Sequence, residues 1–226
     1  LAPPRPLATA PRRATSQVGL PPAAPLSVQG SKPGRATPSP HLAPAPLSTL
    51  VPPEEAIPAL DTLLAELPQR SARPRDRLRV VIEGAFCEQP PIGLLEVLEE
   101  AGCYVVEDDL LLGWRWITGD VAGEGDPYDR LGAAYVNQAV PSSTRHEGRE
   151  HRSVGLIEKV RRANAQAVIF MPAKFCEPAL FDYVLMRQGL ERAGIPHMLV
   201  EFEEKMWTFE RTRNEIETFV ESMMFD

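Results

Sequence analysis

Cysteine has the most distinctive chemistry of any residue type in this 226-residue chain, and it occurs three times, as Cys87, Cys103 and Cys176. Cys87 and Cys176 each stand in a Phe-Cys-Glu triplet followed by proline, in the segments GAFCEQPP and PAKFCEP. Thiolates suit zinc or iron–sulfur centres. The chain has no CxxC pair and no HExxH, however, and three cysteines cannot complete a four-cysteine site. The residue types alone therefore leave two interpretations open, a reactive or ligating thiol and a small buried hydrophobe.

The two triplets belong to an internal repeat. One copy runs VVIEGAFCEQPP, a helix, AGCYVVEDD, and the other runs AVIFMPAKFCEP, a helix, AGIPHMLVEFEE. In a parallel α/β sheet the turn after each strand lies at the carboxyl edge, where ligands bind, so Cys87 and Cys176 are predicted to share that edge. A helix that starts just after each cysteine is expected to lower its thiol pKa. Cys103 begins an apolar strand and is predicted to be a core residue.

Other polar groups have weaker signals. The acidic runs 107–109 and 201–204 each follow a predicted strand and could hold a divalent cation or serve in acid–base chemistry. Solvated strand exits are the commoner explanation for such runs. Arg115, between Trp114 and Trp116, could clamp a phosphate or stack on a ring, whereas the tryptophans could simply anchor a loop. No GxSxG, GxGxxG or GxxxxGK[ST] motif occurs, and none of the histidines (His41, His146, His151, His197) has a partner defined by a motif.

Strands and helices alternate along the second part of the chain. Short apolar, β-branched runs predict strands at 78–83, 103–106, 167–171 and 197–200. Helical patterns cover 54–67, 91–101, 128–138, 153–164 and 178–193, and a last helix starts near 207. Ser153 is a candidate N-cap, and Gly102 and Gly194 follow helix ends. This order predicts an α/β fold with a doubly wound, mainly parallel sheet and helices on both faces.

Composition divides the chain near residue 50. Residues 1–50 hold twelve of the 24 prolines, five basic residues, and no Asp, Glu or aromatic residue. Such a segment cannot bury enough apolar surface to fold, so we predict a disordered Pro-rich tail. A wrong reading frame, or a truncated gene joined upstream of the real coding segment, would produce a Pro-rich sequence of the same kind. Residues 51–226 are predicted to form the α/β domain that contains both repeats.

Charge and cysteine usage exclude some function classes. The chain total of −7 leaves −12 for residues 51–226, which disfavours nucleic acid as a partner. No run of 18 apolar residues occurs, so no membrane span is predicted. An odd, low cysteine count is typical of a reducing cytoplasm.

Four segments carry a resemblance to a known family: GAFCEQPP, AGCYVVEDDLLLGWRW, KFCEPALFDY and EFEEKMWTFERTRNEIETFVES. Over about residues 50–226 the chain resembles the C-terminal domain of the 2-hydroxyacyl-CoA dehydratase and benzoyl-CoA reductase family. Within the family it is most similar to the B-type subunit of ATP-dependent benzoyl-CoA reductase. Leucines in EDDLLLGWRW, where related dehydratases often have a cysteine, favour the reductase branch.

The resemblance implies a cofactor and partners. Family members are two-domain α/β subunits that pair with a paralogous subunit as heterodimers and hold [4Fe–4S] clusters through cysteines. A separate ATP-hydrolysing iron–sulfur activator supplies low-potential electrons, and the substrates are aromatic or 2-hydroxyacyl-CoA thioesters. Cys176 matches the family's C-terminal cluster ligand, and Cys87 matches a position where reductase-like members have a cysteine. Catalytic and substrate-binding residues are not implied.

The chain departs from the family in lacking the N-terminal domain that supplies further cluster ligands. The cluster could therefore be incomplete here, and the fragment alone is expected to be inactive. Three functions stay open: a subunit of an iron–sulfur acyl-CoA reductase, a 2-hydroxyacyl-CoA dehydratase component, and a non-catalytic fragment or partner-binding domain.

Overall fold

The computed structural model describes residues 50–66, 69, 76–111, 115, 119–138, 140–144 and 151–224. The disorder predicted for residues 1–50 lies outside the described residues, except for Leu50, and so do the roles considered for Trp114 and Trp116. The described residues fall into two units. Residues 119–138 belong to one unit, and the sheet with its helices belongs to the other.

The described strands form one sheet of four parallel strands, which confirms the predicted α/β class. Its strands are β1 (Leu78–Glu83), β2 (Cys103–Asp108), β3 (Ala167–Phe170) and β4 (His197–Leu199), in the spatial order β2-β1-β3-β4. All four predicted strands are present, with ends within two residues of those expected. Because the chain passes from β1 to β2 on one side and reaches β3 and β4 on the other, the strand order reverses between β1 and β3. Such a reversal marks the crevice where open α/β sheets bind ligands.

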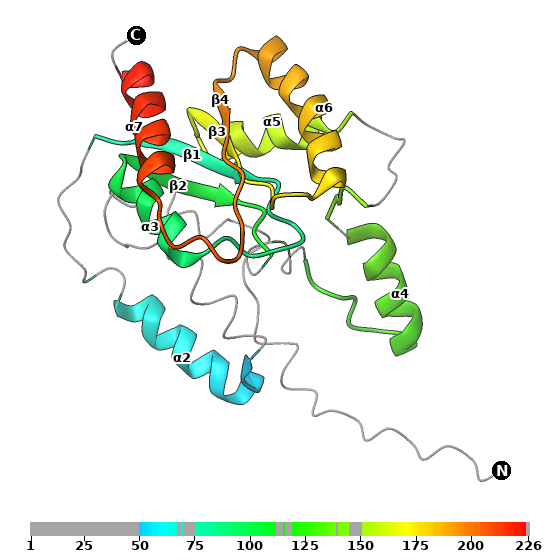
Figure 1. The fold of residues 1–226 in the computed structure, drawn as a ribbon. Helices are drawn as coiled ribbons and strands as arrows, with labels where there is room; N and C mark the ends of the chain where they lie inside the picture. Colours follow the sequence, from blue (N-terminus) through cyan, green and yellow to red (C-terminus); the bar gives the residue numbers. More distant parts are fainter. Residues whose placement is uncertain are drawn as a thin grey trace. The chain divides into compact units, whose positions relative to one another are not determined.

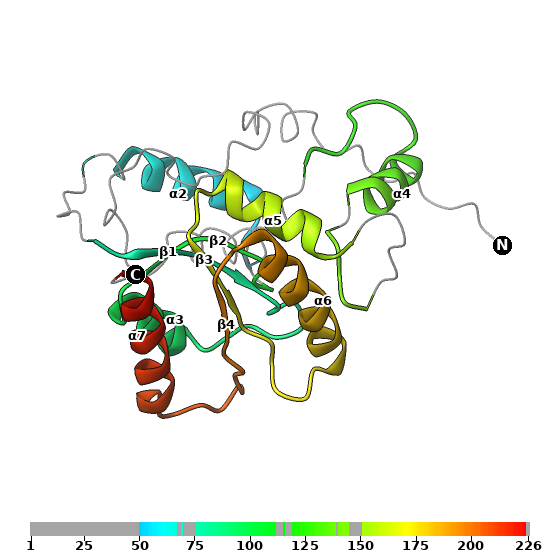
Figure 2. The same cartoon turned by 90° about the horizontal axis from the view of Figure 1, so that it is seen from above.

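Helices cover both faces of the sheet (Figures 1 and 2). α3 (Ile92–Glu100) and α7 (Glu210–Met224) pack with Val80, Ile82 and their neighbours on one face. α5 (Ser153–Arg162) and α6 (Glu177–Ala193) pack with Val81, Val168 and Phe170 on the other. Successive residues of β1 thus enter opposite cores, as side-chain alternation along a strand requires, and this explains why its central residues Val80, Val81 and Ile82 are all apolar.

The helix ends follow the predicted signals only in part. Gly194 adopts a left-handed conformation (φ 67°) after α6, and Gly102 (φ 102°) follows α3, so both end signals are confirmed. The cap predicted at Ser153 is wrong: Ser153 is the first helical residue, and its hydroxyl hydrogen-bonds with His151 Nδ1 at 2.7 Å. The last helix begins at Glu210, three residues later than expected.

The structure describes two further helices. α2 (Pro53–Glu66) comes before β1. α4 (Pro127–Gln138) forms in the separate unit, where the Asp126 carboxylate accepts hydrogen bonds from the backbone N–H groups of Tyr128 and Asp129, at 2.9 and 3.3 Å. Asp before Pro at a helix start is a favourable cap. None of the described helices has both the length and the apolar character that crossing a membrane requires.

Candidate functional site

Cys87 and Cys176 lie together at the carboxyl edge of the sheet. Cys87 is in the loop after β1 and Cys176 is in the loop after β3, and these two strands are neighbours. The Cys87 thiol donates to the Cys176 sulfur with an Sγ–Sγ distance of 3.4 Å. A disulfide would need about 2.05 Å, and both thiols are free. The structure therefore brings together, at the strand-order reversal, the two cysteines that the repeat singled out.

The loops that carry these cysteines turn through unusual backbone conformations. Gly84 begins the Cys87 loop at φ 102°, and Phe175 precedes Cys176 at φ 63°. A positive φ costs a phenylalanine free energy that glycine does not lose, and such strain often accompanies functional sites. The Phe175 side chain is also 90% exposed. The Cys176 loop is thus held in a conformation that neither backbone preference nor burial of Phe175 favours.

The protonation expected for Cys87 was wrong. Partial burial of its sulfur and the hydrogen bond to Cys176 raise the pKa of Cys87 to about 11, although the residue as a whole is exposed. The helix dipole does not offset this, because α3 begins only at Ile92. Cys176, in contrast, is the residue directly before α6. A metal bound at Cys87 would have to displace a proton that the free thiol holds at neutral pH.

Cys103 is the core residue that the sequence predicted. It is fully buried at the start of β2, opposite Leu78 at the start of β1, and burial raises its pKa to about 12. The starts of parallel strands lie at the amino edge, so Cys103 is at the opposite edge of the sheet from Cys87 and Cys176. It cannot join them as a third ligand.

The acidic run 107–109 is not a solvated strand exit. Glu107, Asp108 and Asp109 are all buried, with 3–5% of their surface exposed. Two of them meet cationic side chains: Arg162 of α5 reaches Glu107 at 3.4 Å, and Arg115, six residues further along the chain, reaches Asp109 at 3.0 Å. The other run behaves as expected for a strand exit, because its glutamates at 201, 203 and 204 are exposed.

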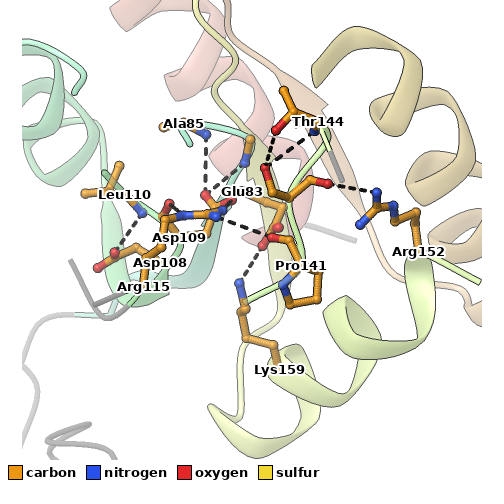
Figure 3. Close-up of polar contacts among 12 residues, drawn as sticks. Glu83, Ala85, Asp108, Asp109, Leu110, Arg115, Pro141, Thr144, Arg152 and Lys159 are labelled. Carbon is orange, nitrogen blue, oxygen red and sulfur yellow. Dashed lines mark hydrogen bonds and ion pairs between the residues drawn. The ribbon is translucent and has the colours of Figure 1, made fainter. Parts of the chain in front are cut away.

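A partly buried lysine completes this acidic network (Figure 3). Lys159 of α5 meets the carboxylate of Glu83, the last residue of β1, at 2.6 Å. Burial alone would lower the pKa of Lys159, but the charges of Glu83 and Asp109 outweigh it and raise that pKa. Burial, with the nearby Asp109 charge, raises the pKa of Glu83 above its usual value. The Asp108 carboxylate accepts a hydrogen bond from the backbone N–H of Leu110 at 3.0 Å. Burial raises the pKa of Asp108 to about 7.

Arg115 serves as an anchor and is not available as a free phosphate ligand. Its guanidinium donates to the Asp109 carboxylate at 3.0 Å, to the Asp109 carbonyl at 3.1 Å and to the Pro141 carbonyl at 3.3 Å. It also lies 5.8 Å from the centre of the Phe86 ring. Sequence reasoning missed this role, because Arg115 and Pro141 are far apart in the chain.

Neither described histidine joins the thiol pair: His151 bonds with Ser153, and the ring of His197 packs against Phe170. No group of three or more His, Cys, Asp or Glu side chains converges as a metal site within the described part of the chain.

Comparison with known proteins shows the family. Residues 27–223 match a family profile described as "2-hydroxyglutaryl-CoA dehydratase, D-component". The chain belongs to the 2-hydroxyacyl-CoA dehydratase and benzoyl-CoA reductase family. The match begins upstream of residue 50, where the segment patterns alone placed the start of the resemblance. Members of this family are acyl-CoA reductase or dehydratase enzyme subunits and are typically iron–sulfur proteins.

Relatives from both branches of the family are about equally similar. The C-type subunit of benzoyl-CoA reductase from Thauera aromatica is 31% identical over 77% of this chain and 45% of the relative. The (R)-phenyllactyl-CoA dehydratase beta subunit of Clostridium sporogenes is 30% identical over 71% of this chain and 42% of the relative. The lactoyl-CoA dehydratase beta subunit of Anaerotignum propionicum is 31% identical over the same two shares, 71% and 42%. The chain therefore spans less than half the length of these relatives.

Proposed function

We propose that this chain is part of a subunit of an iron–sulfur acyl-CoA reductase that uses ATP-driven electron transfer to reduce the ring of benzoyl-CoA-type thioesters. The observation that carries the proposal is the pair of free thiols, 3.4 Å apart at the strand-order reversal of a member of this family. The similarity to a benzoyl-CoA reductase subunit supports the reductase branch. That relative is the C-type subunit, whereas the sequence motifs suggested the B-type subunit, so the subunit type is itself part of the proposal.

Thiols are the right ligand type for an iron–sulfur cluster, but two of them are too few to hold one. Cys176 and Cys87 would hold the cluster, and a [4Fe–4S] cluster commonly takes four cysteine ligands. The described residues offer these two and no third, because Cys103 is buried at the far edge. The remaining ligands would come from outside the described residues. When bound, the cluster would supply one-electron transfer at low potential, while this chain's loops would position two of its ligands.

The partners follow from the same proposal. Two relatives are beta subunits of dehydratases, which implies partner subunits in this family. We propose a paralogous subunit as the stable partner, an ATP-hydrolysing iron–sulfur activator as the electron donor, and an acyl-CoA as the substrate. The proposed compartment is the cytoplasm. The chain alone is expected to be inactive, because its described residues bring together only two of the four cysteine ligands that a [4Fe–4S] cluster commonly takes.

A dehydratase component is the second candidate, and the dehydratase subunits with 30–31% identity favour it. The same thiols would then serve a transient electron injection into a 2-hydroxyacyl-CoA. A non-catalytic fragment or partner-binding domain is the third candidate, and it is favoured because only two thiols converge among the described residues.

Anaerobic reconstitution with Fe²⁺ and sulfide tests the cluster proposal. Wild-type protein should retain iron with a thiolate-to-iron absorption, Cys176→Ser should retain much less, and Cys103→Ala should match the wild type. Failure of the wild type to retain iron, alone and with its partner subunit, would favour the non-catalytic alternative. Product analysis of the assembled enzyme with benzoyl-CoA and with a 2-hydroxyacyl-CoA separates the two enzyme candidates.

A further inference from the structure

The loop that carries Cys87 is held at its base by one buried carboxylate. Asp109 Oδ1 accepts hydrogen bonds from the backbone N–H groups of Gly84 and Ala85, at 2.9 and 3.4 Å. These are the first two residues after β1, where the chain turns through the positive φ of Gly84. Asp109 directly follows β2, is 4% exposed, and donates its own N–H to Ile82 of β1 at 3.2 Å. The carboxylate therefore has a fixed place from which to orient the loop.

Arg115 occupies the other oxygen of this carboxylate. It donates to Asp109 Oδ2 at 3.0 Å, and the two side chains are 14% and 5% exposed. The same guanidinium donates to the carbonyl of Pro141 (Figure 3). It also lies over the ring of Phe86, the residue next to Cys87. With both oxygens engaged by N–H donors, Asp109 is a poor ligand for a divalent cation, the role considered for this acidic run. What remains for it is to orient the Cys87 loop.

We propose that Asp109 and Arg115 act together as positioning residues for Cys87, holding its loop so that the thiol faces Cys176. The inference rests on the proposed function, since it assumes that the thiol pair is the working site. Hydrogen bonds to a buried charged group are strong, and removing one partner leaves the other charge uncompensated. Either loss should therefore release the loop and let the Cys87 sulfur move away from Cys176.

The test is the rate at which a short bifunctional thiol reagent links Cys87 to Cys176 in the metal-free chain, followed by mass spectrometry. Asp109→Ala removes the acceptor for Gly84 and Ala85, and Arg115→Gln removes the charge partner. Crosslinking should slow about tenfold in Asp109→Ala. Loss of the charge-assisted hydrogen bonds should make the loop conformation that brings the two sulfurs together about tenfold less populated. Asp109→Asn, which keeps an acceptor oxygen for the loop, should slow it less. Arg115→Gln should slow it severalfold.

Two controls separate positioning from general stability. Arg213→Gln and Glu100→Ala break an ion pair between α7 and α3, outside the Cys87 loop, and should leave the crosslinking rate unchanged. Cys103 is fully buried, so its labelling by a monofunctional thiol reagent reports unfolding. This labelling should stay slow in every variant that remains folded. If Asp109→Ala unfolds the chain and exposes Cys103, the crosslinking rate of Arg115→Gln tests the positioning role instead.

Crosslinking within twofold of wild type in a folded Asp109→Ala or Arg115→Gln variant would overturn the inference. This readout uses no metal. A failure to bind iron would therefore count against the proposed function alone, and an unchanged crosslinking rate would count against the positioning role alone.

Discussion

The three cysteines show how position in the fold decides what one residue type does. Cys87 and Cys176 stand at the carboxyl edge with their sulfurs 3.4 Å apart, whereas Cys103 is buried in the core at the other edge. Sequence reasoning could assign these positions because each cysteine has a fixed place relative to an apolar strand. It could not predict the raised pKa of Cys87, which depends on the distance to Cys176 and on how far beyond the loop α3 begins.

Substitution by serine should therefore cost more stability at Cys103 than at Cys176. Cys103→Ser places a hydroxyl in an apolar core and should lower the free energy of unfolding by about 1–3 kcal/mol, the cost of an unsatisfied buried polar group. Cys176→Ser, in a half-buried loop, should lower it by less than about 1 kcal/mol. Urea unfolding measures both. An equal loss of stability in the two variants would contradict the assignment of Cys103 to the core.

The raised pKa of Asp108 predicts that the stability of the fold depends on pH. Burial raises its pKa from 3.8 to about 7, so the folded state binds a proton more tightly than the unfolded state does. The contribution of this group is therefore fully present below pH 4 and is lost as the pH rises towards 7, at a limiting slope of about 1.4 kcal/mol per pH unit. Asp108→Asn, which stays neutral, should remove this part of the slope.

The measurement is the free energy of unfolding of wild type and Asp108→Asn at several pH values between 4 and 8, compared as a difference. Other acidic groups titrate in the same range, but they are common to both proteins, so their contributions cancel when the free energy of the variant is subtracted from that of the wild type. A difference that does not change with pH would show that Asp108 is ionised throughout.

At the scale of elements, α5 and α6 pack through a close approach at Gly189. A Cβ built on Gly189 would overlap the side chain of Ser153, whereas one on Gly155 of α5 would meet nothing within 4 Å. Alanine favours a helix over glycine by about 1 kcal/mol, but a clash in a packed interface costs roughly 1–3 kcal/mol. Gly189→Ala should thus lower the melting temperature and Gly155→Ala should raise it. A stabilising Gly189→Ala would mean that the two helices separate at no cost.

The elements themselves were largely predictable, and the contacts between them were not. Continuous apolar runs such as 167–171 identify strands covered on both faces, and glycines at 102 and 194 mark helix ends, because both signals are local. The carboxylates of Asp109 and Glu83 pair with Arg115 and Lys159, and only the folded structure shows these pairings. The acidic run therefore resembled a solvated exit until its partners were placed. The missed role of Ser153 has a similar cause, since His151 competes for its hydroxyl.

At the scale of the whole molecule, the described residues supply one edge of the proposed site and two of the four cysteine ligands that a cluster commonly takes. The chain spans 42–45% of the length of the three relatives described above, and its described residues bring only two thiols together. The proposed cluster would therefore need further ligands from outside the described residues. Because the strand-order reversal fixes where β1 and β3 end, the sheet itself sets the separation of the two cysteine loops.

The central claim is that Cys87 and Cys176 form one thiolate site, and titration of the metal-free chain with Cd²⁺ tests it most directly. Two thiolates about 2.3 Å from one tetrahedral zinc ion lie roughly 3.8 Å apart, so the observed 3.4 Å needs little movement for the sulfurs to share a soft ion. We predict a thiolate-to-cadmium absorption that saturates near one ion per chain. Cys87→Ser and Cys176→Ser should each weaken binding by more than the roughly tenfold that loss of an outer-shell partner costs, and Cys103→Ser should leave it unchanged. Equal binding by wild type and Cys176→Ser, or loss of binding in Cys103→Ser alone, would contradict the account.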